Sequence, residues 1–186
     1  CLAGSPGAAT AAADPSFALR LYRQVARGTG NVFLSPYSVV SAMAMAAQGA
    51  RGETARQMTV AMGDTPDGIV RSFAPVTVRL RAEGRPYELS VANALWVERT
   101  FALRPAYADS VTARWNAGVF DADFVGAAEA ARASINRWVE ERTHDRIREL
   151  VPRGALTSLT RLVLANAVYF RGKWQAPFRV AATKPG

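Results

Sequence analysis

The sequence has little of the chemistry on which most enzymes and metal proteins depend. Cys1 is its only cysteine and His144 its only histidine. A single cysteine cannot form an internal disulfide, and one cysteine with one histidine cannot close a zinc site. His144 lies in a charged stretch, where we expect a solvated helix end and not a catalytic base. Neither a G-x-S-x-G nucleophile elbow nor a glycine-rich phosphate loop occurs. We therefore expect no enzymatic activity, no metal and no cofactor.

Long apolar runs and lysines are also scarce. No stretch offers the roughly 20 consecutive apolar residues that a membrane-spanning helix needs. Only Lys173 and Lys184 among the 23 basic residues are lysines, so the formal net charge of +8 comes almost entirely from arginine. Residues 131–186 hold 11 of these bases but only 4 of the 15 acids. This excess could attract a polyanion or an acidic partner surface, and the alternative is a set of arginines on a solvated face. No nucleic-acid motif accompanies them, so we expect no specific nucleic-acid partner.

The composition otherwise belongs to a folding chain, because 186 residues with 49% hydrophobic and 20% charged side chains suffice for one domain with its own core. The first residues differ from the rest. Cys1 opens an alanine- and glycine-rich run, as in a mature bacterial lipoprotein whose signal peptide has been removed. Under this hypothesis Cys1 carries a lipid and residues 1–15 form a flexible tether at the cell envelope, so the protein is extracellular or secreted. The alternative is a fragment boundary that happens to fall at Cys1.

Helical spacing dominates residues 16–63. Phe17, Leu21 and Val25 recur on one face and predict an amphipathic helix that ends near residues 28–30. Ser35–Pro36 is typical of a helix start, with a capping serine and a proline in the first turn. Residues 39–47 are apolar on every side, so we expect this second helix to be buried all round. A short third helix is indicated over residues 52–62, closed by Gly63.

Two serines interrupt the apolar second helix. Ser38 and Ser41 lie three residues apart and therefore on one face. Buried hydroxyl groups need hydrogen-bond partners, and we expect these partners to come from elsewhere in the fold.

The remaining elements mix helices with strands. Residues 69–80 leave both possibilities open, because Pro75 should break a helix whereas residues 76, 78 and 80 alternate as in a strand. A strand is indicated over 89–97, and helices over 105–115 and 127–143. Residues 162–170 (LVLANAVYF) have Asn166 as their one polar member and favour a strand buried on both faces. The amide of Asn166 then belongs either to a structural network or to a functional device. Together these elements predict an α+β fold.

Four blocks of sequence stand out together: residues 31–39 (NVFLSPYSV) with 49–54 (GARGET), 89–96 (LSVANALW), 135–140 (INRWVE), and 166–174 (NAVYFRGKW). In order and spacing, from about Phe17 to Phe178, they resemble the serpin family. The resemblance implies a domain over residues 16–186 in which N-terminal helices pack on a large mixed or antiparallel central sheet, incomplete in this chain. Residues 135–140 would belong to the helix that lies across this sheet.

The resemblance also implies a function. Serpins are suicide inhibitors of serine proteases and sometimes of cysteine proteases. The protease attacks an exposed reactive loop, and the cleaved loop then inserts into the central sheet as a new strand. Strain stored in the native fold drives the insertion, which distorts the active site of the acylated protease.

By position, the resemblance assigns roles in this conformational switch. Trp174 would cover the point where insertion starts. Ser38, Ser41 and Asn166 would form a polar cluster beneath the sheet, and the alternative is a static set of satisfied core groups. The strand 162–170 would border the gap that the loop enters, as represented by Leu162, Leu164, Val168 and Phe170.

The family's reactive loop and C-terminal strands lie downstream of the residues that match. We therefore expect this chain alone not to inhibit, and to expose residues 162–170 as an apolar sheet edge. Two alternatives remain for the function. One is a non-inhibitory binding protein of the same fold that holds a polyanion or a protein ligand, and the other is an inactive truncated product.

Overall fold

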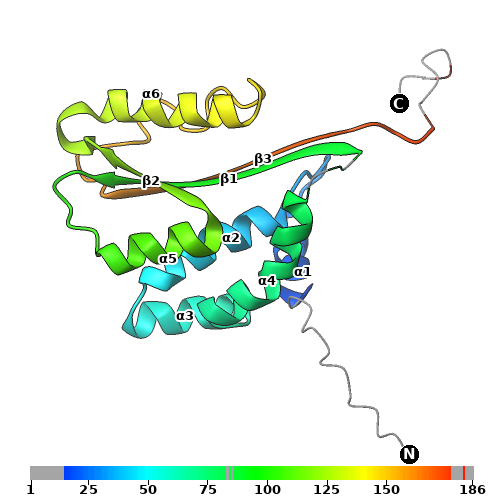
Figure 1. Cartoon of the computed structure of the whole chain (residues 1–186), viewed down its shortest axis with the longest axis horizontal. Helices are drawn as coiled ribbons and strands as arrows, with labels where there is room; N and C mark the ends of the chain where they lie inside the picture. The colour runs from blue at the N-terminus through cyan, green and yellow to red at the C-terminus, as the bar shows by residue number, and fades with distance from the viewer. Residues whose placement is uncertain (1–14, 83, 85, 177–181, 183–186) are drawn as a thin grey trace, which may run out of the picture.

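The computed structural model describes residues 15–82, 84, 86–176 and 182. A sheet forms the middle layer, with helix α6 on one face and the other helices on the opposite face (Figure 1). This arrangement confirms the predicted α+β fold. The elements in chain order are α1 (Pro15–Val25), α2 (Pro36–Gly49), α3 (Gly52–Met62), α4 (Pro66–Arg81), β1 (Tyr87–Glu98), α5 (Pro105–Trp115), β2 (Ala117–Ala122), α6 (Phe124–Arg142) and β3 (Leu162–Gly172).

Helix α2 begins and lies as its sequence predicts. The Oγ atom of Ser35 accepts a hydrogen bond from the backbone N–H of Ser38 at 3.3 Å, and Pro36 is the first helical residue. Proline suits this position because its missing N–H would have no partner there. Every residue of α2 except Gly49 is buried or half-buried. The helix therefore occupies the interior, between the sheet and the outer helices.

Residues 66–81 form one helix, α4, so the segment that the sequence left open is helical throughout. Its start is well specified, because the hydroxyl oxygen of Thr65 caps the first turn. Val76 and Leu80 alternate as in a strand, but they are also four residues apart and so lie on one helix face. Pro75 lies inside the helix on its exposed side. Packing of the buried Ile69 and its neighbours against the core outweighs the helix-breaking cost of this proline.

Strand β1 is the central strand of the sheet, whose order is β2-β1-β3. It pairs with β2 in parallel from Asn93↔Ala117 to Glu98↔Ala122. It pairs with β3 antiparallel over all but its last residue, from Tyr87↔Gly172 to Val97↔Leu162. The sheet is therefore mixed. Because β2 reaches only half of β1, the first half of β1 forms a two-stranded ribbon with β3 that extends away from the body of the molecule (Figure 1).

The two faces of β1 supply two separate cores. Leu95 and Val97 belong to the larger core, which they share with α2, α5 and neighbouring helices. The intervening Ala94 and Trp96 belong to the second core, under α6. The period-2 alternation of a strand sends successive side chains to opposite layers.

Helix α6 covers the second core with the side predicted from its sequence. Ile135 and Val139 are fully buried, and Trp138 packs edge-on against Trp96 with ring centroids 5.2 Å apart. The helix begins at Phe124, three residues before the predicted start. Asp123 caps this first turn, because its Oδ1 atom accepts the backbone N–H of Gly126 at 2.6 Å. Ala127 then has non-helical dihedral angles (φ −145°, ψ 46°), so the helix is kinked at the residue where the sequence predicts its start.

Candidate functional site

Strand β3 has one edge paired and one edge without a strand partner in the described part of the chain. Its inner edge is joined to β1 through eleven consecutive residue pairs. On the face of the sheet that α2 and α5 cover, Leu162 and Leu164 pack against the larger core. On the face that α6 covers, Val163 and Ala165 pack against the second core. The outer edge therefore presents a row of backbone N–H and C=O groups that another strand can pair with.

The prediction that residues 162–170 are buried on both faces is wrong for most of the strand. Only Ala165 and Ala167 are buried, and Phe170 is 64% exposed. The physical reason lies in the ribbon, because the second half of β3 lies beyond both core clusters, to which β3 contributes only residues 162–165. Val168 is half-buried and Phe170 leans on the ring of Tyr87, with centroids 5.7 Å apart.

The amide of Asn166 is paired across the strands. Its Nδ2 group donates to Oδ1 of Asn93 at 2.7 Å, and these two residues are register partners in the β1–β3 ladder. The Nδ2 group of Asn93 in turn donates to the backbone oxygen of Trp115 at 3.0 Å, at the end of α5. Asn93 is only 4% exposed. A short chain of hydrogen bonds therefore runs from β3 through β1 into the helix layer.

Asn93 is the member of this network that the sequence prediction missed. The signal was present, because Asn93 interrupts the apolar series 89, 91, 95 and 97, just as Asn166 interrupts the series 162, 164, 168 and 170. Two polar interruptions at the middle of two strands are matched when the strands pair.

The predicted source of hydrogen-bond partners for the two serines is wrong. The Oγ of Ser41 donates to the backbone oxygen of Tyr37 at 2.7 Å, within the same helix. The Oγ of Ser38 donates to Oγ of the capping Ser35 at 2.8 Å. Serine hydroxyls readily bond to the carbonyl one helical turn earlier, so no distant partner is needed. Among the described residues no hydrogen bond joins either serine to Asn166, and a shared switch role for the three residues stays a prediction.

Two other residues singled out from the sequence lie at or beyond the edge of the described structure. Trp174 follows the end of β3 by two residues and is 71% exposed. Its role over the start of an insertion site stays a prediction. Cys1 and the proposed tether to residue 14 lie outside the described residues, and so does any test of a lipid there.

A buried carboxylate fixes α6 to the end of β1. Glu98 is 1% exposed, and its Oε2 atom accepts the backbone N–H groups of Phe124 at 2.6 Å and Val125 at 3.2 Å. Its Oε1 atom accepts the N–H and the hydroxyl of Thr100 at 3.2 and 3.0 Å. Burial acts to raise the pKa of Glu98, but these four hydrogen bonds outweigh it and hold the pKa below its ordinary value. The charge also lies at the positive end of the α6 dipole.

Several of the C-terminal arginines have carboxylate partners. Arg132 is 9% exposed and its guanidinium contacts Glu129 at 2.7 Å and Glu149 at 3.4 Å. The hydrogen bond from Arg132 holds the pKa of Glu129 below its ordinary value. Arg148 lies 3.8 Å from Glu140. These ion pairs neutralise part of the positive charge that could attract a polyanion.

His144 is half-exposed, as predicted, but it has specific contacts. Its Nε2 atom lies 2.9 Å from a carboxylate oxygen of Glu88, and its ring packs on Tyr169 with centroids 4.5 Å apart. The described residues contain no cluster of three histidine, cysteine or acidic side chains that could hold a metal ion. None of the described helices is both long and apolar enough to cross a bilayer.

The architecture of helices over a mixed sheet and the partnerless edge of β3 agree with a family assignment. A family model described as serpin (serine protease inhibitor) matches residues 12–186. The chain belongs to the serpin family.

Curated relatives and solved structures give the same result. The chain is 41% identical over 175 residues to the leukocyte elastase inhibitor of Bos taurus, covering 93% of this chain and 46% of that protein. It is 42% identical over 173 residues to a serpin-like protein of Thermococcus kodakarensis, covering 91% of this chain and 40% of that one. The crystal structure of serpin-12 from Manduca sexta superposes with a TM-score of 0.83 at 31% identity, over 93% of this chain and 48% of that chain. The chain thus spans less than half the length of the relatives it matches.

Proposed function

We propose that the protein to which this chain belongs inhibits a serine protease as a suicide substrate, and that β3 borders the place where the cleaved reactive loop inserts. The observation that carries the proposal is the outer edge of β3. It has no strand partner among the described residues, and the strand is held in register by an eleven-residue ladder on its other side. Such an edge can accept a strand without losing its own pairing.

Two further observations support the proposal. The matching family is described as a serine protease inhibitor, and one relative carries the name leukocyte elastase inhibitor. The Asn166–Asn93 bond lies on the face of the sheet that α2 and α5 cover, where inserting a strand requires β3 to move relative to these helices. In this proposal the chain supplies the accepting sheet, and the reactive loop comes from the part of the family's length that the chain does not span.

In the proposed reaction the serine oxygen of the protease attacks a carbonyl carbon of the loop. An ester bond forms, the peptide C–N bond breaks, and the new amino terminus leaves with a proton. The loop segment that carries the ester then pairs with β3, and the protease is trapped before water can hydrolyse the ester.

The test uses the intact protein from its natural source and a panel of serine proteases of different side-chain specificity. We expect at least one protease to form a complex that survives boiling in denaturant. Its mass should be that of the protease plus the inhibitor up to the cleaved bond, because the segment after that bond is no longer covalently attached. The matched control is the same protease with its catalytic serine replaced by alanine, which should form no such complex. The 186-residue chain by itself should also form none.

Absence of a covalent complex with every active protease would contradict the proposal. The non-inhibitory alternatives considered from the sequence would then take its place.

A further inference from the structure

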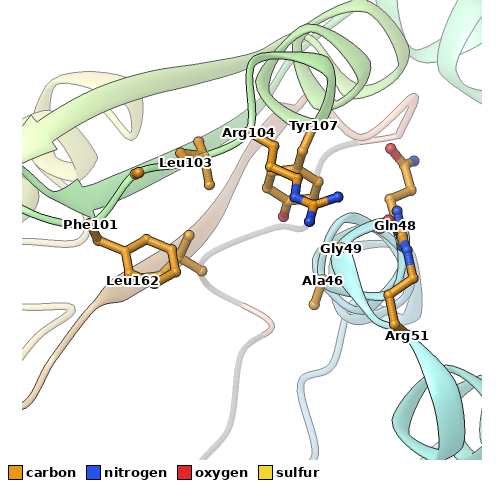
Figure 2. A pocket seen from close by; sticks show the side chains of 10 residues that line it. Ala46, Gln48, Gly49, Arg51, Phe101, Leu103, Arg104, Tyr107 and Leu162 are labelled. Atoms are coloured by element: carbon orange, nitrogen blue, oxygen red, sulfur yellow. Dashed lines mark hydrogen bonds between the residues drawn. The ribbon is translucent and has the colours of Figure 1, made fainter.

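A pocket of about 520 Å³ opens beside the start of β3, on the face of the sheet that α2 and α5 cover (Figure 2). Its volume is within the range of about 300–1,000 Å³ that is usual for small-molecule sites. It is formed by the end of α2, the segment between β1 and α5, the first turn of α5 and the first residue of β3. The lining residues that matter here are Phe101, Leu103, Leu162, Arg51, Arg104 and Tyr107.

One wall of the pocket is rigid. The ring of Tyr107 packs directly on Gly49, where a Cβ atom would come within 3.1 Å of the ring. The Tyr107 hydroxyl donates to the backbone oxygen of Met45 at 3.1 Å. Burial raises the pKa of the Tyr107 phenol, so this group remains a neutral donor. The cavity between α2 and α5 is therefore held open by a fixed contact.

The floor of the pocket is apolar. Leu162 lines it from β3, and Phe101 and Leu103 line it from the segment before α5 (Figure 2). Phe101 is 48% exposed. Burying an aromatic ring and two leucines that remain in contact with solvent favours the binding of an apolar molecule.

The rim is basic and carries no acid. Arg51 and Arg104 are among the lining residues, whereas no aspartate or glutamate is. Arg51 donates through Nη1 to the backbone oxygens of Gln48 and Ala50 at 3.0 and 2.7 Å, which leaves its other N–H groups available. Within the described part of the chain Arg104 has no carboxylate partner. Two guanidinium groups without an acid attract an anion.

A side-chain amide at the same end also has a free donor. The Oε1 atom of Gln48 accepts the hydroxyl of Ser110 at 2.8 Å, but its Nε2 group is buried and has no acceptor among the described residues. A buried donor without an acceptor is unfavourable. A ligand at the rim reaches this buried group only if the amide turns and gives up its bond to Ser110, so the donor is not counted as part of the binding site.

We propose that this pocket binds a small organic acid, with its apolar body against Phe101, Leu103 and Leu162 and its carboxylate between Arg104 and Arg51. The combination of an apolar floor and a basic rim without an acid fits an apolar molecule that carries one negative charge, and it fits neither a cation nor a neutral polar molecule. The floor shares Leu162 with the strand proposed to border the insertion gap, whereas the other residues that bind the acid come from outside β3. Binding of a small acid there does not require protease inhibition.

The probe is decanoate, which joins an apolar chain to one carboxylate, and the neutral comparison is decanol. Both are titrated calorimetrically, below their aggregation limits, into the protein expressed at its full natural length. We expect saturable binding of decanoate at one site and binding of decanol that is weaker by about tenfold or more, because the alcohol cannot form charge-assisted bonds to arginine.

The variants separate this pocket from general attraction to a basic protein. Arg104→Gln should weaken decanoate binding by about tenfold or more and leave decanol binding unchanged. The matched control is Arg137→Gln, which removes the same charge from an exposed position on α6, across the sheet from the pocket. It should leave both affinities unchanged. Ala102→Trp, at an exposed lining residue, should block both probes while the thermal unfolding midpoint stays close to that of the parent protein.

Equal binding of decanoate and decanol, or an equal effect of the Arg104 and Arg137 variants, would overturn the proposal. So would a lack of saturable decanoate binding in the full-length protein, even if that protein forms covalent complexes with a protease.

Discussion

The side-chain amide of Asn166 donates to the side-chain oxygen of Asn93 at 2.7 Å, in the middle of the β1–β3 pair. The side-chain amide of Asn93 in turn donates to the backbone oxygen of Trp115 at the end of α5. The edge strand of the sheet is thus linked to the helix layer by polar side chains as well as by apolar packing. Any movement of β3 along or away from β1 has to break the first of these bonds.

The first prediction concerns this pair. Asn166→Ala removes the donor and leaves the buried oxygen of Asn93 without a partner, so the free energy of unfolding should fall by about 1–3 kcal/mol. Urea unfolding followed by circular dichroism measures the change. The control is Asn31→Ala, at an exposed asparagine in the segment before α2, which should shift the midpoint little. A variant as stable as the parent would mean that Asn93 finds another donor.

The second prediction concerns the two serines of the proposed switch. Ser41 bonds within its own helix, so Ser41→Ala should cost no more than about 1 kcal/mol. In a double-mutant cycle, Ser41→Ala and Asn166→Ala should show a coupling energy below about 0.5 kcal/mol, because the two side chains share no hydrogen-bond partner. The cycle of Asn93→Ala with Asn166→Ala is the positive control and should show clear coupling. A Ser41–Asn166 coupling above about 1 kcal/mol would instead support a joint polar cluster.

The elements of the fold could be predicted where local chemistry decides them. A capping serine before Pro36 and a glycine after Met62 define helix ends within a few residues, and the structure has them there. Residues 69–80 could not be assigned, because a proline argues against a helix locally whereas the packing that overrides it is tertiary.

The candidate site was predictable to a smaller extent. The apolar strand around Asn166 and the polar interruption in it were visible in the sequence, but the register that opposes Asn166 to Asn93 was not. Register depends on how β1 and β3 pair, and no residue pattern within either strand alone fixes it. Sequence alone predicts distant partners for the two serines, because a buried hydroxyl group needs a hydrogen-bond partner. The helix backbone itself supplies the acceptor for Ser41.

The third prediction concerns Glu98 and acid. Glu98→Gln puts an NH₂ group where the carboxylate receives backbone N–H groups, so α6 should lose part of its attachment and the protein should be less stable at neutral pH. Because the pKa in the folded protein is lower than in the unfolded chain, the stabilisation is fully present above the unfolded value of about 4.3 and is lost as the pH falls through the folded value.

The measurement is the urea midpoint of the parent protein and of Glu98→Gln at about pH 7 and about pH 3. The difference between the two proteins should be large at the higher pH and should shrink at the lower one. Glu141→Gln, at an exposed position of α6, is the control for removing one acidic charge and should show little difference at either pH. A gap that stays constant with pH would show that the charge of Glu98 is not what holds α6.

The fourth prediction concerns the proline inside α4. Pro75 cannot donate the N–H that the helix would direct to the carbonyl of residue 71, and its ring crowds that carbonyl, at a cost of about 3 kcal/mol. Replacing it with alanine restores the hydrogen bond but also gives the unfolded chain more freedom, which takes back about 0.4–1 kcal/mol. Pro75→Ala should therefore raise the free energy of unfolding by about 2–2.6 kcal/mol, read from the urea midpoint. The matched control is Pro66→Ala in the same helix, where proline occupies the first helical position and loses no bond, so that substitution should stabilise nothing. If both variants gained stability equally, the benefit would come from general helix propensity and the interior position of Pro75 would not be the cause.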